Sequence, residues 1–384
     1  MLRGDIKRER VIKALSHQEP DRVPTGEFFW GAFLKRWRED YRLTENADPY
    51  RWFDLDYIVI NPNMDPHIKN FQIIEKTDDY VIVKTGWECR VKKKFDDPMP
   101  AYLDFSVKTR EDIEKFKFDD PYDSRRYYQR GDDMINGVGD SFIQNIPSFV
   151  ERVNMYKNDF CIFGSVCEPY ETLWRIIGSV EALQKLALEP ELIRDFNARI
   201  TEFMIGIGKA QVKAAGGALS GLYIWGDVAY TRGMLFSPEL WERLFYPYVK
   251  KMCEEFHSLG MKVIYHGCGD SRAIMDMLID AGIDGYNPLE AKAGFDVVEL
   301  KKKYGKRLAW VGNIDVRVLA NGSKEDIKRE VLRKLNAAKG GGYIFQSDHS
   351  VPGNVPPENY TYALQLVKEF GRYPLDLGEF EEAI

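Results

Sequence analysis

The chain has 384 residues, of which 44% are hydrophobic and 30% charged, a composition typical of a globular protein with a sizeable core. Its formal net charge of -6 gives no reason to expect nucleic acid or an anionic membrane as a partner. No apolar run approaches the roughly 20 residues of a membrane span, and the first residues lack a signal-peptide core. The five cysteines are irregularly spaced, as reduced thiols are. We therefore expect a cytoplasmic protein.

Short apolar runs alternate with amphipathic helical stretches along most of the chain. A helix is predicted first, from Arg8 to Leu15, and Ser323 begins a later helix with a capping-box pattern. The strand candidates are Val23 to Phe29, Tyr57 to Ile60, Phe160 to Gly164, Leu222 to Gly226, Val263 to His266, Gly285 to Asn287, Leu308 to Val311 and Tyr343 to Phe345. Eight alternating units favour an α/β protein, a parallel (β/α)8 TIM barrel.

The alternation is interrupted between the second and third units. Residues 71 to 94 alternate apolar and polar side chains with period two around Asp78 and Asp79, which predicts an antiparallel hairpin. Residues 96 to 140 are rich in Asp, Pro and Tyr and predict a loop-and-helix excursion over the barrel mouth. We therefore expect one domain over residues 1–384, with an insertion at roughly 65–145.

Ligand-type residues follow several predicted strands, where TIM barrels place their catalytic groups. His266 and Cys268 alternate at one strand end, so both can reach one ion. Glu290 follows the next strand and His349 follows the last. Two imidazoles, a thiolate and a carboxylate form a tetrahedral set appropriate to zinc. The alternative is a metal-free pocket lined by His266 and Cys268, in which His349 donates a hydrogen bond to substrate.

Other polar residues at strand ends are candidates for substrate binding. Asp227 and Arg232 lie in an aromatic-flanked loop with Trp225 and could hold a polar substrate group, or they could pair with each other and fix the loop. Asn313 and Asp315 could face the substrate. Alternatively, they satisfy the strand-end turn and cap the next helix.

Several motifs resemble the uroporphyrinogen decarboxylase superfamily, and the resemblance covers nearly the whole chain. They are Arg8-Glu-Arg-Val-Ile-Lys-Ala-Leu, Glu19-Pro-Asp-Arg-Val-Pro24, Phe236-Ser-Pro-Glu-Leu-Trp, Tyr246-Pro-Tyr-Val-Lys and Val311-Gly-Asn-Ile-Asp315. This resemblance implies a TIM barrel. The superfamily contains cofactor-free decarboxylases and also zinc methyltransferases that exchange methyl groups with corrinoid proteins.

The chain departs from the decarboxylases in the loop after the first strand. Their Arg-Gln-Ala-Gly-Arg-Tyr signature, whose arginines hold the carboxylates of the substrate, is replaced by Gly26-Glu-Phe-Phe-Trp-Gly-Ala-Phe33. Losing two charge-assisted pairs would cost several kcal/mol. Asp227 matches the decarboxylase aspartate only loosely, so decarboxylation is the disfavoured alternative.

The methyltransferase branch has a His-x-Cys pair, a later acid and a distant cysteine. This chain keeps His266, Cys268 and Glu290, but His349 stands in place of the last cysteine. Replacing a thiolate by a neutral imidazole leaves a more Lewis-acidic metal. Such a metal suits polarising the oxygen or nitrogen of a methyl donor.

The resemblance and the residues together predict a zinc-dependent methyltransferase that demethylates a small donor, such as a methyl ether, and passes the methyl group to a corrinoid protein. The corrinoid is expected on a partner because the chain shows no motif for it. Asp227 and Glu290 are the expected catalytic residues. The expected substrate contacts are Phe28, Phe29, Trp30, Trp225, Arg232, Asn313 and Asp315. A homodimer is a candidate assembly, and the rivals are a cofactor-free decarboxylase and a non-catalytic binding protein.

Overall fold

The computed structural model describes residues 2–69, 72–95, 97, 99–133 and 143–384. Its centre is a sheet of seven parallel strands whose spatial order follows their order in the chain. The strands are β1 (Tyr57–Val59), β8 (Cys161–Cys167), β9 (Leu219–Trp225), β12 (Lys262–His266), β13 (Gly285–Asn287), β14 (Ala309–Val311) and β15 (Tyr343–Ile344). Because all seven run in the same direction, their carboxyl ends meet at one edge, as the predicted α/β fold requires.

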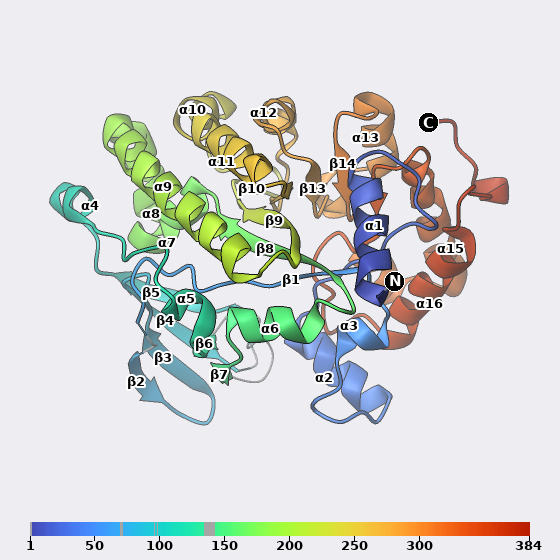
Figure 1. Ribbon diagram of the computed structural model, residues 1–384, viewed down its shortest axis with the longest axis horizontal. Coiled ribbons are helices and arrows are strands. Elements are labelled where there is room, and N and C mark those ends of the chain that lie inside the picture. The colour runs from blue at the N-terminus through green and yellow to red at the C-terminus, as the bar shows by residue number, and fades with distance from the viewer. Residues whose placement is uncertain (1, 70–71, 96, 98, 134–142) are drawn as a thin grey trace.

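The described residues form α-helices, most of which follow strands and cover the outer face of the sheet (Figure 1). They are α1 (Arg3–Leu15), α2 (Gly31–Asp40), α3 (Pro49–Trp52), α4 (Arg110–Lys115), α5 (Arg125–Tyr128), α6 (Phe149–Tyr156), α7 (Pro169–Ile177), α8 (Ser179–Leu188), α9 (Pro190–Ala214), α10 (Pro238–Leu244), α11 (Tyr246–Ser258), α12 (Met275–Ala281), α13 (Val297–Tyr304), α14 (Val316–Asn321), α15 (Lys324–Leu335) and α16 (Pro357–Phe370). The predicted cap is present, since Ser323 and Asp326 form a reciprocal capping box at the start of α15.

The prediction of a regular strand from Val23 to Phe29 is wrong. The segment is extended and makes isolated parallel bridges, Thr25 to Phe345 and Phe29 to Val351. Pro24 has no N–H to donate, and the Thr25 N–H bonds the Asp56 carboxylate at 2.7 Å instead of a strand carbonyl. The Thr25 carbonyl nevertheless accepts from Asp56 N at 2.7 Å. The segment therefore connects β15 to the start of β1 and completes the ring without a full ladder.

A buried ion-pair network explains why the opening motif contains two arginines. Asp56 is fully buried and pairs with Arg10 at 2.5 Å and with Arg22 at 2.7 Å. Arg10 lies on α1, and Arg22 begins the extended segment. A buried carboxylate without such partners would be strongly unfavourable, so these arginines tie α1 and the segment to the start of β1.

The chain between β1 and β8 forms an inserted module. Its main part is an antiparallel sheet of β2 (Gln72–Lys76), β3 (Tyr80–Lys84), β4 (Cys89–Lys94) and β5 (Ala101–Phe105), and a two-stranded sheet follows with β6 (Gly131–Asp133) and β7 (Ile143–Ile146). The Tyr102 ring packs on Trp174 of α7 with centroids 5.2 Å apart. Because α7 follows the carboxyl end of β8, the module sits beside the mouth of the barrel. Part of the expected loop excursion lies outside the described residues.

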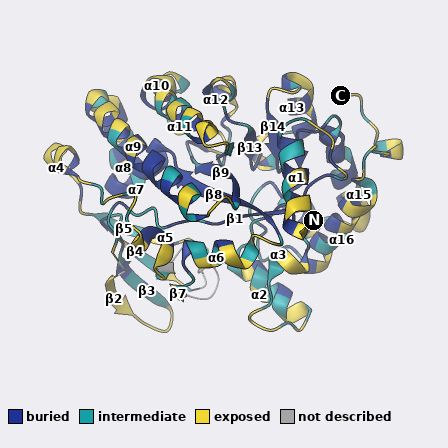
Figure 2. Ribbon diagram, viewed as in Figure 1, coloured by how far each residue is buried: buried dark blue, intermediate teal, exposed yellow. Residues whose placement is uncertain are grey.

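The core has two main parts. Figure 2 shows that burial is concentrated in the central sheet and on the helix faces turned toward it. A smaller cluster joins inward-facing strand residues such as Phe163, Tyr223 and Ile264 to Val11 and Leu15 of α1, so this helix closes one end of the barrel. The larger cluster lies between strands and outer helices. Among the described residues, no helix combines the length and apolar character needed to cross a membrane.

Candidate metal and substrate site

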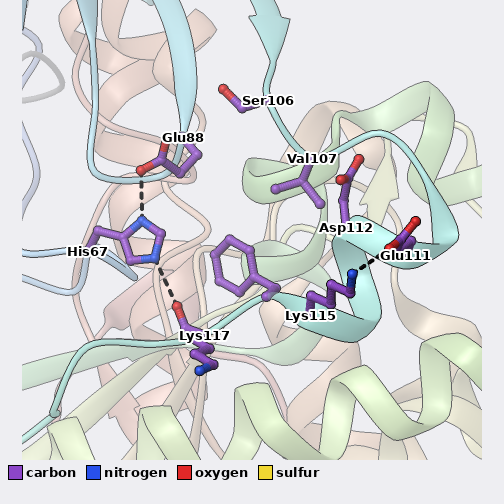
Figure 3. Close-up of a pocket in the computed structure, with 9 residues that line it drawn as sticks. His67, Glu88, Ser106, Val107, Glu111, Asp112, Lys115 and Lys117 are labelled. Atoms are coloured by element: carbon purple, nitrogen blue, oxygen red, sulfur yellow. Dashed lines mark hydrogen bonds and ion pairs between the residues drawn. The ribbon is translucent and has the colours of Figure 1, made fainter.

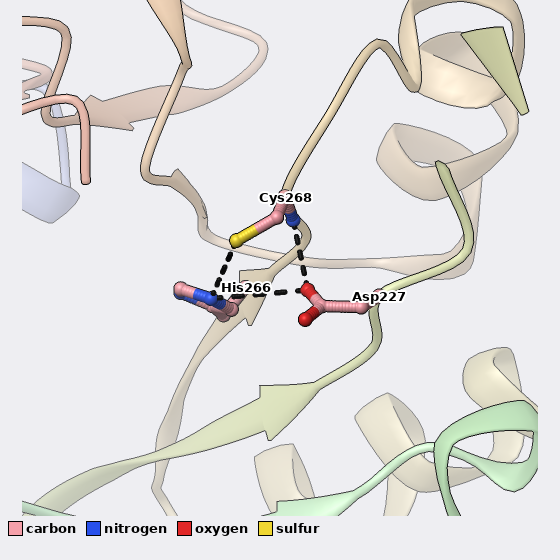
Figure 4. A group of neighbouring side chains, drawn as sticks. All are labelled: Asp227, His266 and Cys268. Carbon is pink, nitrogen blue, oxygen red and sulfur yellow. Dashed lines mark hydrogen bonds and ion pairs between the residues drawn. The ribbon is translucent and has the colours of Figure 1, made fainter. Parts of the chain in front are cut away.

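Ligand-type side chains gather at the carboxyl ends of the parallel strands. The ligand atoms of Asp227, His266 and Cys268 all lie within 4.8 Å of one another (Figure 4), and so do those of Cys268, Glu290 and His349. Cys268 belongs to both groups and is therefore the centre of the cluster. The side chains proposed as zinc ligands from the sequence thus lie together, and Asp227 stands beside them.

The chemistry and spacing of this cluster fit a zinc ion. Ligand atoms bonded to tetrahedral zinc at about 2.0 to 2.3 Å lie roughly 3.3 to 3.8 Å from one another. The Cys268 Sγ is 3.4 Å from the His266 Nε2. The ligand atoms of Cys268, Glu290 and His349 lie within 4.8 Å of one another, so Cys268 is the donor that joins His266 to Glu290 and His349. Mixed imidazole, thiolate and carboxylate donors are also those that zinc accepts.

His266 is oriented by a residue on the neighbouring strand. Its Nδ1 is 2.6 Å from the Asn287 Oδ1, and the Asn287 Nδ2 donates to the Val311 carbonyl at 3.0 Å. Because the amide nitrogen is used by that carbonyl, the amide oxygen faces His266, and Nδ1 carries the proton. The lone pair is then on Nε2, on the side of Cys268, where a metal would need it.

Asp227 follows β9 and fixes the Cys268 loop. Its Oδ1 accepts a hydrogen bond from Cys268 N at 2.9 Å and lies 3.9 Å from the His266 Nε2. Its side chain is 48% exposed, so a substrate can reach the carboxylate. Arg232 lies at the exposed turn between β10 (Ala229–Tyr230) and β11 (Gly233–Met234). Asp227 and Arg232 both lie among the described residues and form no ion pair with each other. The alternative that an Asp227–Arg232 ion pair fixes this loop is therefore wrong.

Glu290 and His349 arrive on loops that a buried carboxyl group ties together. Glu290 is only 4% exposed. Asp348, next to His349, accepts hydrogen bonds from Ala291 N at 2.9 Å and from Val316 N at 3.0 Å. The loop after β15 is therefore fastened both to the Glu290 loop and to the start of α14.

Aromatic rings stand against both imidazoles. The Trp225 ring is 4.9 Å from His266, and Phe28 lies 5.8 Å from Trp225 and 6.5 Å from His266. Trp30 stacks on His349 with centroids 5.8 Å apart. Phe28, Trp30 and Trp225 thus form an apolar wall beside the ligand cluster.

Phe29 lies elsewhere, contrary to its expected role as a substrate contact. Its ring stacks on Phe33 of α2 at 5.3 Å and on Phe53 at 5.6 Å. In an extended segment, neighbouring side chains point to opposite sides, so Phe28 and Phe29 cannot both face the mouth. Phe29 packs the segment against the outer helices instead.

Asn313 and Asp315 take the structural roles that were the alternative to substrate binding. Asn313 is fully buried; its Oδ1 accepts from Val297 N at 2.9 Å, and its Nδ2 donates to the Leu289 carbonyl at 2.7 Å. Asp315 is the N-cap of α14 and accepts from Arg317 N at 2.8 Å. The Asn313 side chain is committed to backbone groups, and the Asp315 carboxylate is committed to the Arg317 N–H and guanidinium, so neither takes the expected role of a substrate contact.

The electrostatics of the cluster favour a positive ion. Burial raises the pKa of the Cys268 thiol, and the carboxylates of Asp227 and Glu290 raise it further. Burial lowers the pKa of His266, which keeps its imidazole neutral. Lys292 Nζ, 3.4 Å from the Glu290 carboxylate, is a positive group at its edge. Neutral imidazoles and a thiolate are the forms that bind metal, and an ion would offset the clustered negative charge.

Two residues important for this arrangement were not predicted. Asn287 is the last residue of β13 and pairs in register with His266, so its place at a strand end was a usable signal. Glu27, which lies within the predicted first strand from Val23 to Phe29, is 2% exposed and contacts the loop of His349. No pattern along the chain joins Glu27 to a residue 320 positions later.

A second depression lies on the inserted module, beside α4 (Figure 3). His67 contacts the Glu88 carboxylate at 2.7 Å, and the Lys115 ammonium pairs with Glu111. Burial alone would raise the pKa of Glu88, but hydrogen bonds from Lys69, Lys84 and His67 lower it to about 2. These charges satisfy one another, so the depression lacks the unbalanced groups found at the strand ends.

A parallel α/β sheet wrapped by helices, with ligand-type side chains converging at the carboxyl ends of its strands, defines a barrel enzyme whose chemistry takes place at the barrel mouth. Residues 134–370 match the family described as "Uroporphyrinogen decarboxylase (URO-D)". The chain belongs to this family, and the resemblance predicted from its motifs is confirmed.

The similar proteins include both decarboxylases and methyltransferases. A uroporphyrinogen decarboxylase of Syntrophotalea carbinolica is 28% identical over 58% of this chain, and the match spans 65% of that enzyme. The methylcobamide:CoM methyltransferase MtbA of Methanosarcina acetivorans is 22% identical over 94% of this chain and 98% of its own length. A solved methyltransferase from Methanosarcina mazei has the same fold, with a TM-score of 0.67 at 18% identity over 95% of this chain and 98% of its own.

Proposed function

We propose that this protein is a zinc-dependent methyltransferase. It removes the methyl group of a small donor, such as a methyl ether, and delivers it to a corrinoid carried by a separate protein. The observation that carries the proposal is the convergence of His266, Cys268, Glu290 and His349 at the strand ends. Similarity to MtbA over nearly the full length of both chains supports it.

The residues around the cluster have distinct parts in this proposal. Zinc bound by the four ligands would act as a Lewis acid on the leaving heteroatom of the donor. Asn287 holds His266 with its Nε2 lone pair toward the cluster. Phe28 and Trp225 pack the apolar part of the donor and exclude water, and the exposed Asp227 carboxylate orients its polar part. Glu290 is the ligand that we expect the donor to displace.

The cofactor-free decarboxylase is less well supported. Residues 26–33 contain no arginine or lysine that could hold substrate carboxylates. In the structure, this segment presents the rings of Phe28 and Trp30 to the ligand cluster. An apolar wall next to a metal-type donor set suits a small apolar donor better than a polycarboxylate.

Metal analysis of the purified protein tests the proposed function. We expect about one zinc per chain, and we expect Cys268→Ala to lose it, because a set without its central thiolate holds zinc far more weakly. Cys253→Ala is the matched control: Cys253 is a fully buried free cysteine on α11, outside the cluster, and its variant should keep the metal. Wild-type protein that remains without stoichiometric metal after zinc is supplied would exclude this function.

A further inference from the structure

The loop that carries His349 is held by an unusual contact with Glu27. The Ser347 hydroxyl oxygen lies 2.6 Å from the Glu27 Oε1 and also within hydrogen-bond distance of the His349 carbonyl oxygen. Ser347 N donates to the Glu27 Oε2 at 3.1 Å. Glu27 and Ser347 are 2% and 1% exposed, so both side chains are shielded from bulk solvent.

The number of hydrogens decides the direction of these bonds. A serine hydroxyl has one hydrogen, and a backbone carbonyl can only accept. If Ser347 donates to the His349 carbonyl, the contact with Glu27 must be donated by Glu27. The carboxyl group must then carry a proton on Oε1, while Oε2 accepts from Ser347 N. Burial favours the same state, because an ionised carboxylate without a cationic partner is costly in the interior.

The neighbours of Glu27 do not supply a compensating charge. The titratable groups that act on it are the phenols of Tyr50, Tyr57, Tyr223 and Tyr360, and burial raises the pKa of each of them, so all four are neutral at pH 7. Burial raises the pKa of Glu27 itself to about 8, although hydrogen bonds from Ser347, Phe28 and Tyr360 act against that shift.

We propose that Glu27 is a positioning residue that holds His349 in the ligand set through a neutral carboxylic acid. Its proton bonds the Ser347 hydroxyl, which in turn bonds the His349 carbonyl. The same Oε1 accepts from Phe28 N at 2.9 Å, so one side chain places both the imidazole and part of the apolar wall. This inference rests on the proposed function in treating His349 as a zinc ligand.

Two substitutions at Glu27 test whether its hydrogen bonds to Ser347 are needed for zinc binding. Glu27→Gln replaces the acid by a neutral group that can still donate to Ser347 Oγ and accept from Ser347 N, and it gives up only the acceptor for Phe28 N, so zinc affinity should fall clearly less than in Glu27→Leu. Glu27→Leu removes both bonds and should weaken zinc binding by roughly 10-fold or more, as loss of a ligand-orienting partner does. Zinc affinity is measured by competition with a chromogenic chelator.

Two further variants test whether Glu27 influences zinc affinity through His349. In a His349→Ala background, Glu27→Leu should cause no additional loss of zinc affinity, because the ligand it positions is already absent. Asp284→Leu is the matched control, since it removes a half-buried carboxylate at the opposite end of the barrel, where Asp284 accepts from Val263 N at 2.8 Å. This control should lower stability without weakening zinc binding.

The proton is observed directly by infrared spectroscopy at pH 6.5. The wild-type minus Glu27→Gln difference should contain a protonated carboxylic-acid band and no carboxylate band from this residue. Glu27→Gln that binds zinc as poorly as Glu27→Leu, or a carboxylate band, would overturn the inference. A wild-type protein that shows the acid band but binds no zinc would instead refute the proposed function and leave the neutral Glu27 in place.

Discussion

The two imidazoles of the cluster are held in different ways. His266 belongs to a strand and is oriented by the Asn287 side chain on the next strand. His349 belongs to a loop and is held through its backbone and by the stacked Trp30 ring. A strand residue has little freedom to move, whereas a loop residue depends on its tethers. Of the two proposed imidazole ligands, His349 is therefore the one that we expect to be more sensitive to substitutions nearby.

Substitutions at His349 test whether it is a zinc ligand. His349→Cys should keep the metal, since a thiolate is as good a ligand as imidazole, but should slow demethylation of an ether donor because its negative charge lowers the Lewis acidity of zinc. His349→Ala should lose much of both metal and activity. Metal content and turnover are measured on both variants. If His349 only contacts substrate, both variants would retain zinc equally and lose activity together.

Individual elements follow local rules even where the barrel departs from regularity. The extended segment before α2 is not a strand because Pro24 cannot donate and Thr25 N is used by Asp56. In contrast, α15 begins where its capping box predicts, and it packs against the outer helices α16, α14 and α13. Its stability can therefore be changed without altering the site.

Removing the cap of α15 should lower stability alone. In Ser323→Ala, the Asp326 N–H loses the side-chain oxygen that accepts from it at 3.2 Å. We expect the free energy of unfolding to fall by about 1 kcal/mol, as for other N-cap serines. Urea denaturation measures this, and zinc content should be unchanged. A variant with wild-type stability would show that the cap contributes nothing here.

At the scale of the whole molecule, buried acids give stability a definite dependence on pH. Glu168 follows β8 and is fully buried, and among the described residues neither of its carboxyl oxygens has a hydrogen-bond partner. Burial raises its pKa well above the usual value, and it raises that of Glu27 to about 8. Unfolded glutamates lose their protons near pH 4.5, so above that pH the folded state binds more protons than the unfolded state.

Stability should therefore fall as pH rises from about 6.5 to 8. Each buried acid lowers the free energy of unfolding by about 1.4 kcal/mol per pH unit between its unfolded and folded pKa. His17, whose pKa burial lowers to about 4, has the opposite effect, but only below the unfolded histidine pKa of about 6.5.

Urea denaturation at several pH values measures this slope, with the wild type compared with Glu168→Gln. The glutamine is neutral throughout, so the variant should show a shallower decline by about one proton. An identical slope in the two proteins would mean that Glu168 is already ionised in the folded state.

The sequence by itself determined the class of fold and the set of ligand-type residues. Strand ends can be located from apolar runs, and parallel strands bring their carboxyl ends to one edge, so His266, Cys268, Glu290 and His349 could be expected to meet. The family motifs carried the same information. Alternation along a strand also explained how His266 and Cys268 could share one ion.

Only the tertiary structure decided which side chains serve the site and which serve the fold. Phe28 and Phe29 are chemically alike, and their roles differ only because one faces the mouth and the other faces α2. Asn287 ends β13 and Asn313 follows β14, but Asn287 contacts the His266 imidazole whereas Asn313 accepts from the Val297 N–H. Glu27 meets Ser347 across 320 residues. Hydrogen bonds of this kind depend on the positions of distant backbone groups, and those positions exist only once the barrel has closed.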